Sequence, residues 1–243
     1  MKRYAISDIH GNAYAFLKLL DHVDPDPEEM VIVGDLCNRG LDTWGVFEET
    51  SQLIDEGATV VMGNHDLWFQ QTVSGKFPMQ NFHSEQVGGI TTSKSIELAT
   101  KRHGPDVVGK TISNIYNNMV MYHEEDDYIF VHAGLDPRVP YMNMQKAGIL
   151  MMGCDDWKKA AEIHCYDQYV VFGHTPTWNI HREITEEEPT VWMSHRAKKI
   201  AIDTGAGFGR RLTMVDLIDG IAYAYDFSAR KVVEYRFKRG ARR

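Results

Sequence analysis

Short apolar runs alternate with longer segments of mixed polarity along the first third of the chain. The apolar runs predict strands at residues 3–7, 30–33 and 59–62, and the segments between them predict helices at 13–23 and 43–56. Strands and helices in this order are typical of an α/β fold with a mostly parallel sheet. Ligands of such folds bind at the carboxyl ends of the strands, so we expect the functional site there.

The strand rhythm stops between residues 67 and 125. Apolar residues at helical spacing in this segment predict helices at about 93–102 and 107–122. Because no linker flanks the segment, we interpret residues 1–243 as a single domain with a helical insertion at 67–125.

Apolar runs return after the insertion and predict a second group of strands. The last three are closely spaced and separated by the turn residues Asp-Gly and Ser-Ala, which predicts antiparallel pairing. The predicted strands are 128–131, 169–172, 199–202, 212–217, 221–227 and 231–237. The glycine-rich segment 205–211 lies between two of these strands, so we interpret it as a loop and not as a nucleotide cradle.

Residues with metal-binding or acid–base side chains follow five of the predicted strands. They are Asp8, His10, Asp35, Asn64, His65, His132 and His174. Taken singly, each is explained equally well by a helix cap, a turn or a hydrogen-bonded core histidine. Taken together, at equivalent positions of what we expect to be one sheet, they favour a shared site.

The candidate ligands are carboxylate, amide and imidazole groups, without a thiolate. This set excludes a structural zinc cage and suits Mn, Fe, Co or Zn. Six ligands, all of the set except His65, exceed the needs of one ion. We therefore expect two ions that share a bridging carboxylate and activate water for displacement at phosphorus. His65, next to Asn64, is placed to give the leaving oxygen a proton.

The composition limits the partners of the chain. Its 243 residues are 43% hydrophobic and 25% charged and carry a net charge of −8, which argues against a nucleic-acid polymer as partner. No apolar run has the length of a membrane span or a signal peptide. Cys37, Cys154 and Cys165 form no paired framework, so we expect a reducing, cytoplasmic location. The basic residues 238–243 are predicted to be a solvated tail.

Five short motifs carry a family resemblance. They are Asp8-x-His10, GDLCNRG (34–40), GNHD (63–66), VHAG (131–134) and FGHTP (172–176). Together they resemble the calcineurin-like metallophosphoesterases, in particular the phosphoprotein-phosphatase branch. That branch includes small phage and bacterial serine/threonine phosphatases and the symmetrical diadenosine tetraphosphatases. The resemblance extends over about residues 3–218 and implies a two-sheet α/β sandwich with a dinuclear metal site at the sheet edge.

The resemblance also implies a role for each site residue. Asp8, His10 and Asp35 would hold the first metal, and Asn64, His132 and His174 would complete the second. Asp35 would bridge the two ions, and His65 would be the general acid. Arg39 would grip the phosphate oxygens. The implied cofactors are two divalent ions, with Mn in first place and Fe, Zn, Ni or Co as alternatives.

The chain departs from the family pattern around the phosphate. Asn38 stands where the branch has an aspartate; we expect it to accept a hydrogen bond from His65 and to leave the pKa of that imidazole lower than an aspartate would. Met62 stands where the phage phosphatases have an arginine, and the region of the second clamp arginine holds Cys154 instead. Arg138, Arg210 and Arg211 are weak candidates to replace the missing arginines.

Three functional hypotheses follow. The main one is a metal-dependent phosphomonoesterase that acts on phosphorylated proteins and on small phosphoesters. The second is a hydrolase of dinucleoside polyphosphates, which the thin arginine clamp and Asn38 favour. The third, from another class, is a non-catalytic scaffold, which the complete ligand set disfavours. A membrane partner is not expected, and the oligomeric state is not predicted.

Overall fold

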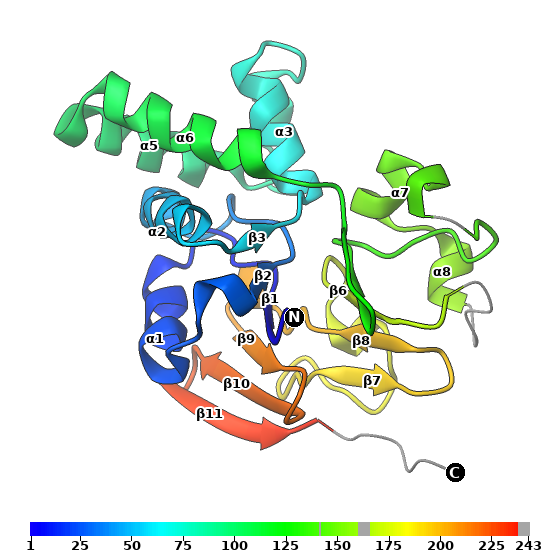
Figure 1. The fold of residues 1–243 in the computed structure, drawn as a ribbon. Coiled ribbons are helices and arrows are strands. Elements are labelled where there is room, and N and C mark those ends of the chain that lie inside the picture. Colours follow the sequence, from blue (N-terminus) through cyan, green and yellow to red (C-terminus); the bar gives the residue numbers. More distant parts are fainter. Residues whose placement is uncertain (141, 160–165, 238–243) are drawn as a thin grey trace.

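The structure is a computed structural model that describes residues 1–140, 142–159 and 166–237. Two β-sheets face each other, and helices lie on their outer sides (Figure 1). The first sheet has the strand order β11-β10-β9-β1-β2-β3. Strands β1, β2 and β3 are parallel, and β9, β10 and β11 continue the sheet antiparallel on the other side of β1. The bounds are β1 (Tyr4–Ile6), β2 (Met30–Ile32), β3 (Thr59–Val60), β9 (Arg211–Asp216), β10 (Ile221–Asp226) and β11 (Lys231–Arg236).

The second sheet has the order β4-β5-β6-β8-β7. Its three central strands are parallel, and each edge strand pairs antiparallel with its neighbour. The bounds are β4 (His123–Glu124), β5 (Tyr128–Phe130), β6 (Tyr169–Phe172), β7 (Trp192–Ser194) and β8 (Lys199–Ala201).

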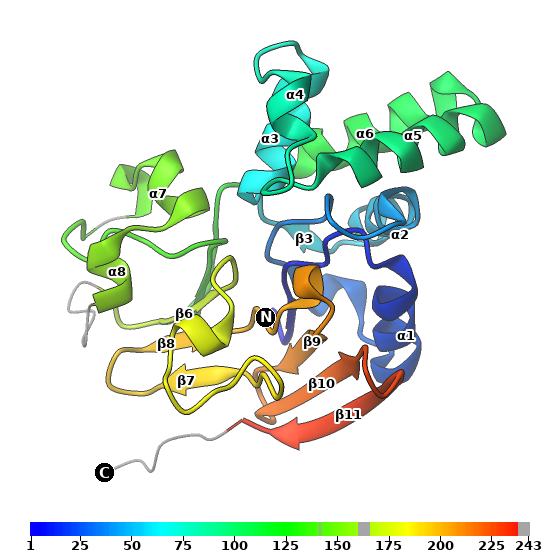
Figure 2. The same ribbon diagram turned by 180° about the vertical axis from the view of Figure 1, so that it is seen from behind.

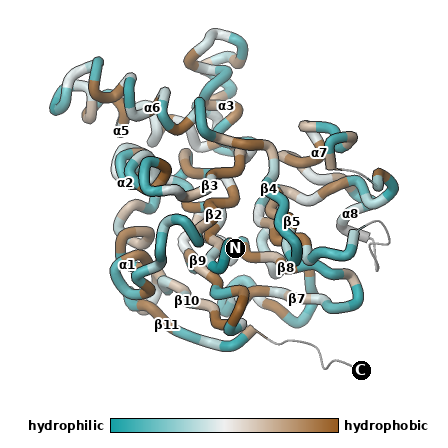
Figure 3. The backbone as a smooth tube through the Cα atoms, viewed as in Figure 1, coloured by the Kyte–Doolittle hydropathy of each residue, from teal (hydrophilic) through white to brown (hydrophobic). Residues whose placement is uncertain are grey.

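Alternate residues of each strand enter different apolar layers. Ala5 and Val31 pack between the two sheets, where they meet Phe130 of β5. Their neighbour Ile6 packs on the helical side of the first sheet, and Ile129 packs on the helical side of the second. This period of two, which is the geometry of a pleated strand, divides the core into one layer between the sheets and one under each group of helices. The hydrophobic stretches accordingly concentrate along the strands (Figure 3).

Helices complete the outer layers. The first sheet is covered by α1 (Ala13–Val23) and α2 (Thr43–Asp55), and the second by α7 (Ala147–Met152) and α8 (Asp155–Lys159). Figure 2 shows the same layers from behind. Short 3₁₀ helices occupy four loops: η1 (Pro27–Glu29), η2 (Met142–Met144), η3 (Thr177–Asn179) and η4 (Ala206–Phe208). The predicted two-sheet α/β fold is confirmed.

The predicted insertion contains four helices. They are α3 (Asn64–Val73), α4 (Met79–Phe82), α5 (Gly89–His103) and α6 (Pro105–Asn118). Helices α5 and α6 form a hairpin that lies over α2 and projects from the body of the molecule (Figure 1). Gly104 at φ +86° and Pro105 at the first helical position separate the two helices. The chain rejoins the sheets through the bridge between Val61 and Val120. The assignment of one domain with an insertion remains a prediction.

Some expectations were wrong. Strands β5 and β6 belong to the second sheet, so the five strand ends do not lie on one sheet as expected. The edge strand β7 and the short helices α7 and α8 were not predicted, because each is too brief to show a period. The parallel pairing of β1 to β3 and the antiparallel pairing of β9 to β11 are confirmed.

Within the described residues, no helix is long and apolar enough to cross a membrane. Cys37 is a buried free thiol and Cys154 a partly buried one. Cys165 and the basic residues 238–243 lie outside the described residues.

Candidate metal centre

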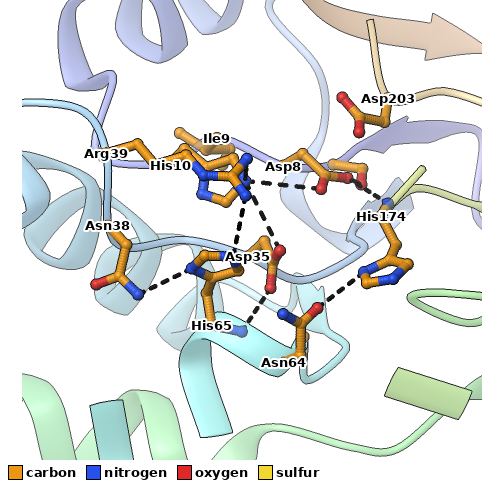
Figure 4. Close-up of polar contacts among 12 residues, drawn as sticks. Asp8, Ile9, His10, Asp35, Asn38, Arg39, Asn64, His65, His174 and Asp203 are labelled. Atoms are coloured by element: carbon orange, nitrogen blue, oxygen red, sulfur yellow. Dashed lines mark hydrogen bonds and ion pairs between the residues drawn. The ribbon is translucent and has the colours of Figure 1, made fainter. Parts of the chain in front are cut away.

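The two sheets bring their carboxyl strand ends together at one place. Residues of the loops after β1, β2 and β3 of the first sheet lie beside His174 of the loop after β6 (Figure 4). The loop after β5 joins them, because Nε2 of its His132 lies 3.3 Å from Oδ2 of Asp35. All six predicted ligands lie there with His65, Asn38 and Arg39, and all except Arg39 and His174 are buried. The residues that the sequence predicted for one site therefore do form one cluster.

The backbone is strained where it delivers these side chains. Six site residues have positive φ angles between 49° and 74°, namely Asp8, His10, Asp35, Asn38, Arg39 and His174. A non-glycine residue in this left-handed region costs about 1–3 kcal/mol. Backbone hydrogen bonds hold two of these turns: the N–H of Asp8 donates to Gly34 O at 3.0 Å, and the N–H of His10 donates to Asp35 O at 2.9 Å. The strain is concentrated at the site, as expected where function fixes the chain geometry.

A steric constraint explains why residue 34 is a glycine. Its φ is +82°, and a Cβ at this position would lie 2.6 Å from the backbone nitrogen of Gly63. The loops after β2 and β3 therefore touch directly, which brings Asp35 and Asn64 into the same site. Glycine at position 34 thus lets the chain turn where a side chain would obstruct it.

Asp35 lies at the centre of the cluster. It belongs to two groups that could each hold a metal ion, His10–Asp35–His65 and Asp35–His132–His174; the ligand atoms of each group lie within 4.8 Å of one another. Its Oδ2 lies 3.3 Å from Nε2 of His132 and 3.7 Å from Nε2 of His10. A carboxylate shared in this way is the geometry that a bridging ligand needs.

The first end of the cluster is formed by Asp8 and His10. Oδ1 of Asp8 lies 3.9 Å from Nε2 of His10, so both face the side of Asp35. Nδ1 of His10 lies 3.0 Å from the carbonyl oxygen of Cys37 and can donate to it. Oδ2 of Asp8 accepts from the backbone N–H of His174 at 2.9 Å and from the Ser7 hydroxyl. These bonds fix which atom of each side chain faces the site.

Asn64, His132 and His174 form the second end. Oδ1 of Asn64 lies 3.1 Å from Nε2 of His132 and 2.9 Å from Nδ1 of His174. The other ring nitrogen of His132 lies 2.8 Å from the carbonyl oxygen of Val33, to which it can donate. Three atoms that can each ligate a cation therefore converge, and the tautomer of His132 that exposes Nε2 is the one that its backbone contact favours.

The buried charges interact strongly. Burial lowers the pKa of His132, but the carboxylates of Asp35 and Asp8 outweigh it and raise the pKa to about 10. Burial raises the pKa of Asp35, but the surrounding imidazoles outweigh it and hold the pKa well below its usual range. Burial raises the pKa of Asp8 to about 6 and lowers that of His10 well below its ordinary value. Such opposed shifts are typical of functional sites.

Oxygen and imidazole donors without a thiolate fit divalent ions such as Mn, Fe, Co or Zn. The two groups that share Asp35, and the convergence of Asn64, His132 and His174, fit the predicted pair of ions. The residues that could hold the first ion are Asp8, His10 and Asp35, and those that could hold the second are Asp35, Asn64, His132 and His174.

His65 lies between the first end of the cluster and Asn38. The backbone N–H of His65 donates to Oδ1 of Asp35 at 2.9 Å, and Nδ2 of Asn38 lies 2.9 Å from Nδ1 of His65. Oδ1 of Asn38 accepts from the hydroxyl of Thr92 at 2.9 Å. Burial lowers the pKa of His65 to about 4. That Asn38 leaves this pKa lower than an aspartate would remains a prediction. The expected hydrogen bond runs the other way, because Thr92 occupies the amide oxygen.

Arg39 borders the site next to His10 and His65. Its Nη1 lies 3.2 Å from Nε2 of His10 and its Nη2 lies 3.3 Å from Nε2 of His65. A planar guanidinium in this position can donate two hydrogen bonds to a phosphate. The three replacement candidates are engaged elsewhere, in ion pairs of Arg138 with Asp136, Arg210 with Glu186 and Arg211 with Asp226.

Two buried carboxylates of the site were not predicted. Asp66 accepts backbone N–H bonds from Asp35, Leu36 and Gly63 at 2.8–3.0 Å, so it holds the turn that carries Asp35. Asp203 lies beside Asp8 (Figure 4), and burial with this neighbour raises its pKa well above the usual range. Asp203 directly follows the predicted strand 199–202, so the rule of polar residues at strand ends could have found it.

The family profile described as calcineurin-like phosphoesterase matches residues 1–193, so the chain belongs to this family. The predicted family is thereby confirmed.

Several relatives are named as dinucleotide hydrolases. The chain is 31% identical over 152 residues to the symmetrical bis(5'-nucleosyl)-tetraphosphatase of Nitrosomonas europaea. The aligned region covers 62% of this chain and 50% of the relative. It is 25% identical over 243 residues to the asymmetrical bis(5'-nucleosyl)-tetraphosphatase PrpE of Bacillus thuringiensis, which covers 88% and 89%. The matches to the symmetrical enzymes thus span only about half the length of those proteins.

Solved structures share the fold. A candidate diadenosine tetraphosphatase superposes with a TM-score of 0.57 at 20% identity and covers 99% of this chain and 96% of its own. A cold-active protein-tyrosine phosphatase from a psychrophilic Shewanella superposes with a TM-score of 0.58 at 16% identity and covers 98% and 81%. At these identities the likeness concerns the fold alone.

Proposed function

We propose that this chain is a divalent-metal-dependent hydrolase of dinucleoside tetraphosphates. The observation that carries the chemistry is the position of Asp35, shared by two groups of metal-binding side chains. The names of the curated relatives support the substrate class over the phosphorylated protein that the sequence first favoured. Mn is the ion we propose in first place, because it suits mixed oxygen and imidazole donors.

The environment of His65 supports the same substrate class. No carboxylate faces its Nδ1, so nothing there stabilises an imidazolium, and the residue is a weak proton donor at neutral pH. A serine or threonine alkoxide is a strongly basic leaving group that requires such a donor. A nucleotide phosphate, whose second pKa is about 6, leaves without one. Asparagine in place of aspartate at position 38 should therefore lower the rate of a dinucleotide hydrolase less than that of a protein phosphatase.

Different protein residues have different roles around the phosphate chain of the substrate. When bound, two divalent ions supply Lewis acidity at the phosphoryl group and at the attacking water. Arg39 binds phosphate oxygens with its two terminal nitrogens and offsets negative charge. His65 presents Nε2 next to Arg39 and forms a hydrogen bond to the leaving oxygen. Asp66 keeps the Asp35 turn in place through its three backbone hydrogen bonds.

A comparison of substrates tests the proposal. The protein is stripped with a chelator, supplied with Mn, Ni, Zn or Mg, and assayed on diadenosine tetraphosphate, a phosphothreonine peptide and p-nitrophenyl phosphate. We expect the highest kcat/KM on the dinucleotide. Two ADP indicate symmetrical cleavage, and ATP with AMP indicates asymmetrical cleavage. A higher kcat/KM on the peptide would favour the protein phosphatase, and no metal-dependent hydrolysis of any substrate would favour the scaffold.

Two variants check the site. Asp35→Asn removes the shared charge and should abolish metal-dependent hydrolysis, with fewer ions bound per chain in a calorimetric titration. Glu97→Gln, which removes an exposed carboxylate paired with Lys101 on α5, is the matched control and should keep wild-type activity. Full activity of Asp35→Asn would show that the site assignment is wrong.

A further inference from the structure

Two aromatic side chains lie together on loops that border the candidate metal centre. Phe208 belongs to η4, in the loop after β8, and Trp178 belongs to η3, in the loop after β6. Their ring centroids are 5.9 Å apart with an interplanar angle of 76°. Phe208 is 53% exposed, and Trp178 is partly exposed. Together the two rings place an apolar aromatic surface beside a site of charged residues.

Phe208 is linked directly to the phosphate-binding side chain. The guanidinium carbon of Arg39 lies 4.8 Å from the centroid of the Phe208 ring. The same guanidinium reaches the imidazoles of His10 and His65. The aromatic pair is thus separated from the proposed phosphate position by a single side chain.

Folding does not account for this pair. A second aromatic pair near the site, Trp68 and Phe77, packs against the core cluster under the first sheet. Within the part of the chain that the structure describes, neither Trp178 nor Phe208 belongs to a hydrophobic core cluster. The contact between Trp68 and Phe77 therefore stabilises the fold, whereas Trp178 and Phe208 contribute no ring to a core.

The two loops are nevertheless fastened to each other. The backbone N–H of Thr177 donates to the carbonyl oxygen of Asp203 at 3.0 Å. Gly205 has φ +84°, and a Cβ there would lie 2.4 Å from Cη2 of Trp178. The indole is therefore pressed against a position where only glycine leaves room for it. This arrangement holds an exposed ring in one orientation, which is what a binding surface requires and an incidental surface residue does not.

We propose that Trp178 and Phe208 form a nucleobase-binding platform, on which one base of the substrate stacks while its phosphates lie at Arg39. The proposal rests on the function proposed above, because it supplies the contact for the nucleoside part of that substrate. Aromatic rings stack on any base, so the platform predicts affinity for a nucleotide with little preference among bases. The glycine-rich loop 205–211 would thus bind the nucleobase through the ring of Phe208 and would not act as a phosphate cradle.

A pair of inhibitors that differ only in the nucleoside tests the platform. The inhibition constants of ADP and inorganic pyrophosphate are measured at fixed free Mn, with p-nitrophenyl phosphate as the reporter substrate. We expect Trp178→Leu and Phe208→Leu to raise the constant for ADP relative to that for pyrophosphate on the order of tenfold. Phe208→Tyr, which keeps the ring, should retain the wild-type ratio. Tyr14→Leu is the matched control and should also retain the wild-type ratio. Tyr14 is an exposed aromatic residue of α1 whose ring contacts that of Tyr225.

The outcomes separate the possible failures. If both constants rise equally, the rings only orient Arg39, and the platform is overturned. An unchanged ratio of the two inhibition constants in folded Trp178→Leu and Phe208→Leu also overturns the platform. Thermal melting shows whether each variant is folded. If Trp178→Leu does not fold, Phe208→Leu, at a half-exposed position, decides the test. If the wild-type protein binds ADP more tightly than pyrophosphate but does not hydrolyse diadenosine tetraphosphate, the proposed function fails while the platform stands.

Discussion

Nδ2 of Asn38 lies 2.9 Å from Nδ1 of His65, on the side of the imidazole away from Arg39. The amide is held in this orientation because its oxygen accepts from Thr92. An amide N–H points at Nδ1 and a guanidinium N–H lies at Nε2, so both ring nitrogens of His65 face donors and neither faces an acceptor, which favours the neutral imidazole over the imidazolium. An imidazolium would require Asn38 to turn its oxygen toward His65 and to exchange its bond with Thr92.

The first prediction concerns the charge at position 38. Asn38→Asp places a carboxylate next to Nδ1 of His65, and an opposite charge at this distance raises an imidazole pKa by about 1–3 units. Because a general acid works only below its pKa, the alkaline limb of the pH–rate profile on a phosphothreonine peptide, whose alkoxide leaving group requires such an acid, should move to higher pH. Asn118→Asp, at an exposed position of α6, should leave the profile unchanged. An alkaline limb that stays in place in Asn38→Asp would contradict the role of His65.

The second prediction concerns Thr92. Its hydroxyl accepts from the backbone N–H of Asn38 at 2.8 Å and donates to Oδ1 of the same residue. Thr92→Val keeps the shape but leaves both buried groups without this partner, so we expect the free energy of unfolding to fall by about 2–3 kcal/mol and kcat to fall with it. Chemical denaturation and steady-state kinetics measure the two effects.

Two further variants identify the cause. Thr92→Ser restores the hydroxyl and should recover most of the stability and activity. Thr91→Val removes the neighbouring hydroxyl, which donates to Gly88 O in a half-buried position, and should cost less than about 1 kcal/mol. Equal losses in Thr91→Val and Thr92→Val would mean that the effect belongs to the helix and not to Asn38.

The third prediction concerns Asp66. Its carboxylate accepts three backbone N–H bonds, and an asparagine would turn an N–H₂ group toward one or more of these donors. Asp66→Asn should lower the free energy of unfolding by about 3 kcal/mol and weaken Mn binding, because the turn that carries Asp35 loses its support. Asp42→Asn is the matched control: Asp42 caps α2 at an exposed position, and asparagine caps a helix equally well. Wild-type Mn affinity in Asp66→Asn would contradict the positioning role.

Much of the site could be predicted because strand ends are visible in the sequence. A run of buried residues followed by Asp35 or His132 marks both the strand and its edge, and five such runs converge. The partition into two sheets could not be predicted from these runs. Ile32 of the first sheet and Ile129 of the second both lie in buried apolar runs of the same kind. A local pattern of this kind does not indicate which sheet a strand joins.

The supporting residues were hidden for another reason. Thr92 and Asp66 lie on helices, where a polar residue at any one position is ordinary, and their partners are far away in sequence. The positive φ angles of Asp35 and Asn38 were equally invisible, since these residues tolerate many conformations in turns. Side chains that fix other side chains are therefore the part of the site that a single sequence specifies least.

The last prediction concerns stability at low pH and a residue outside the site. Asp226 ends β10; its Oδ2 accepts from Nε of Arg211 at 2.9 Å, and its Oδ1 accepts from Ser228 and from the N–H of Ala229. Burial raises its pKa, but these hydrogen bonds outweigh it and lower the pKa to about 2. A lowered carboxylate pKa stabilises the folded state above the unfolded pKa of about 4, and this contribution is lost as the pH falls toward 2.

Asp226→Asn should therefore lower the free energy of unfolding by about 1–2 kcal/mol at pH 7, and the difference from wild type should shrink between pH 5 and pH 3. Urea unfolding at a series of pH values measures it, and the subtraction removes the titration of all other groups. Asp219→Asn, at an exposed carboxylate paired with Arg3, should show a difference of less than about 0.5 kcal/mol throughout. A difference for Asp226→Asn that is the same at pH 7 and pH 3 would mean that packing, and not charge, makes this position important.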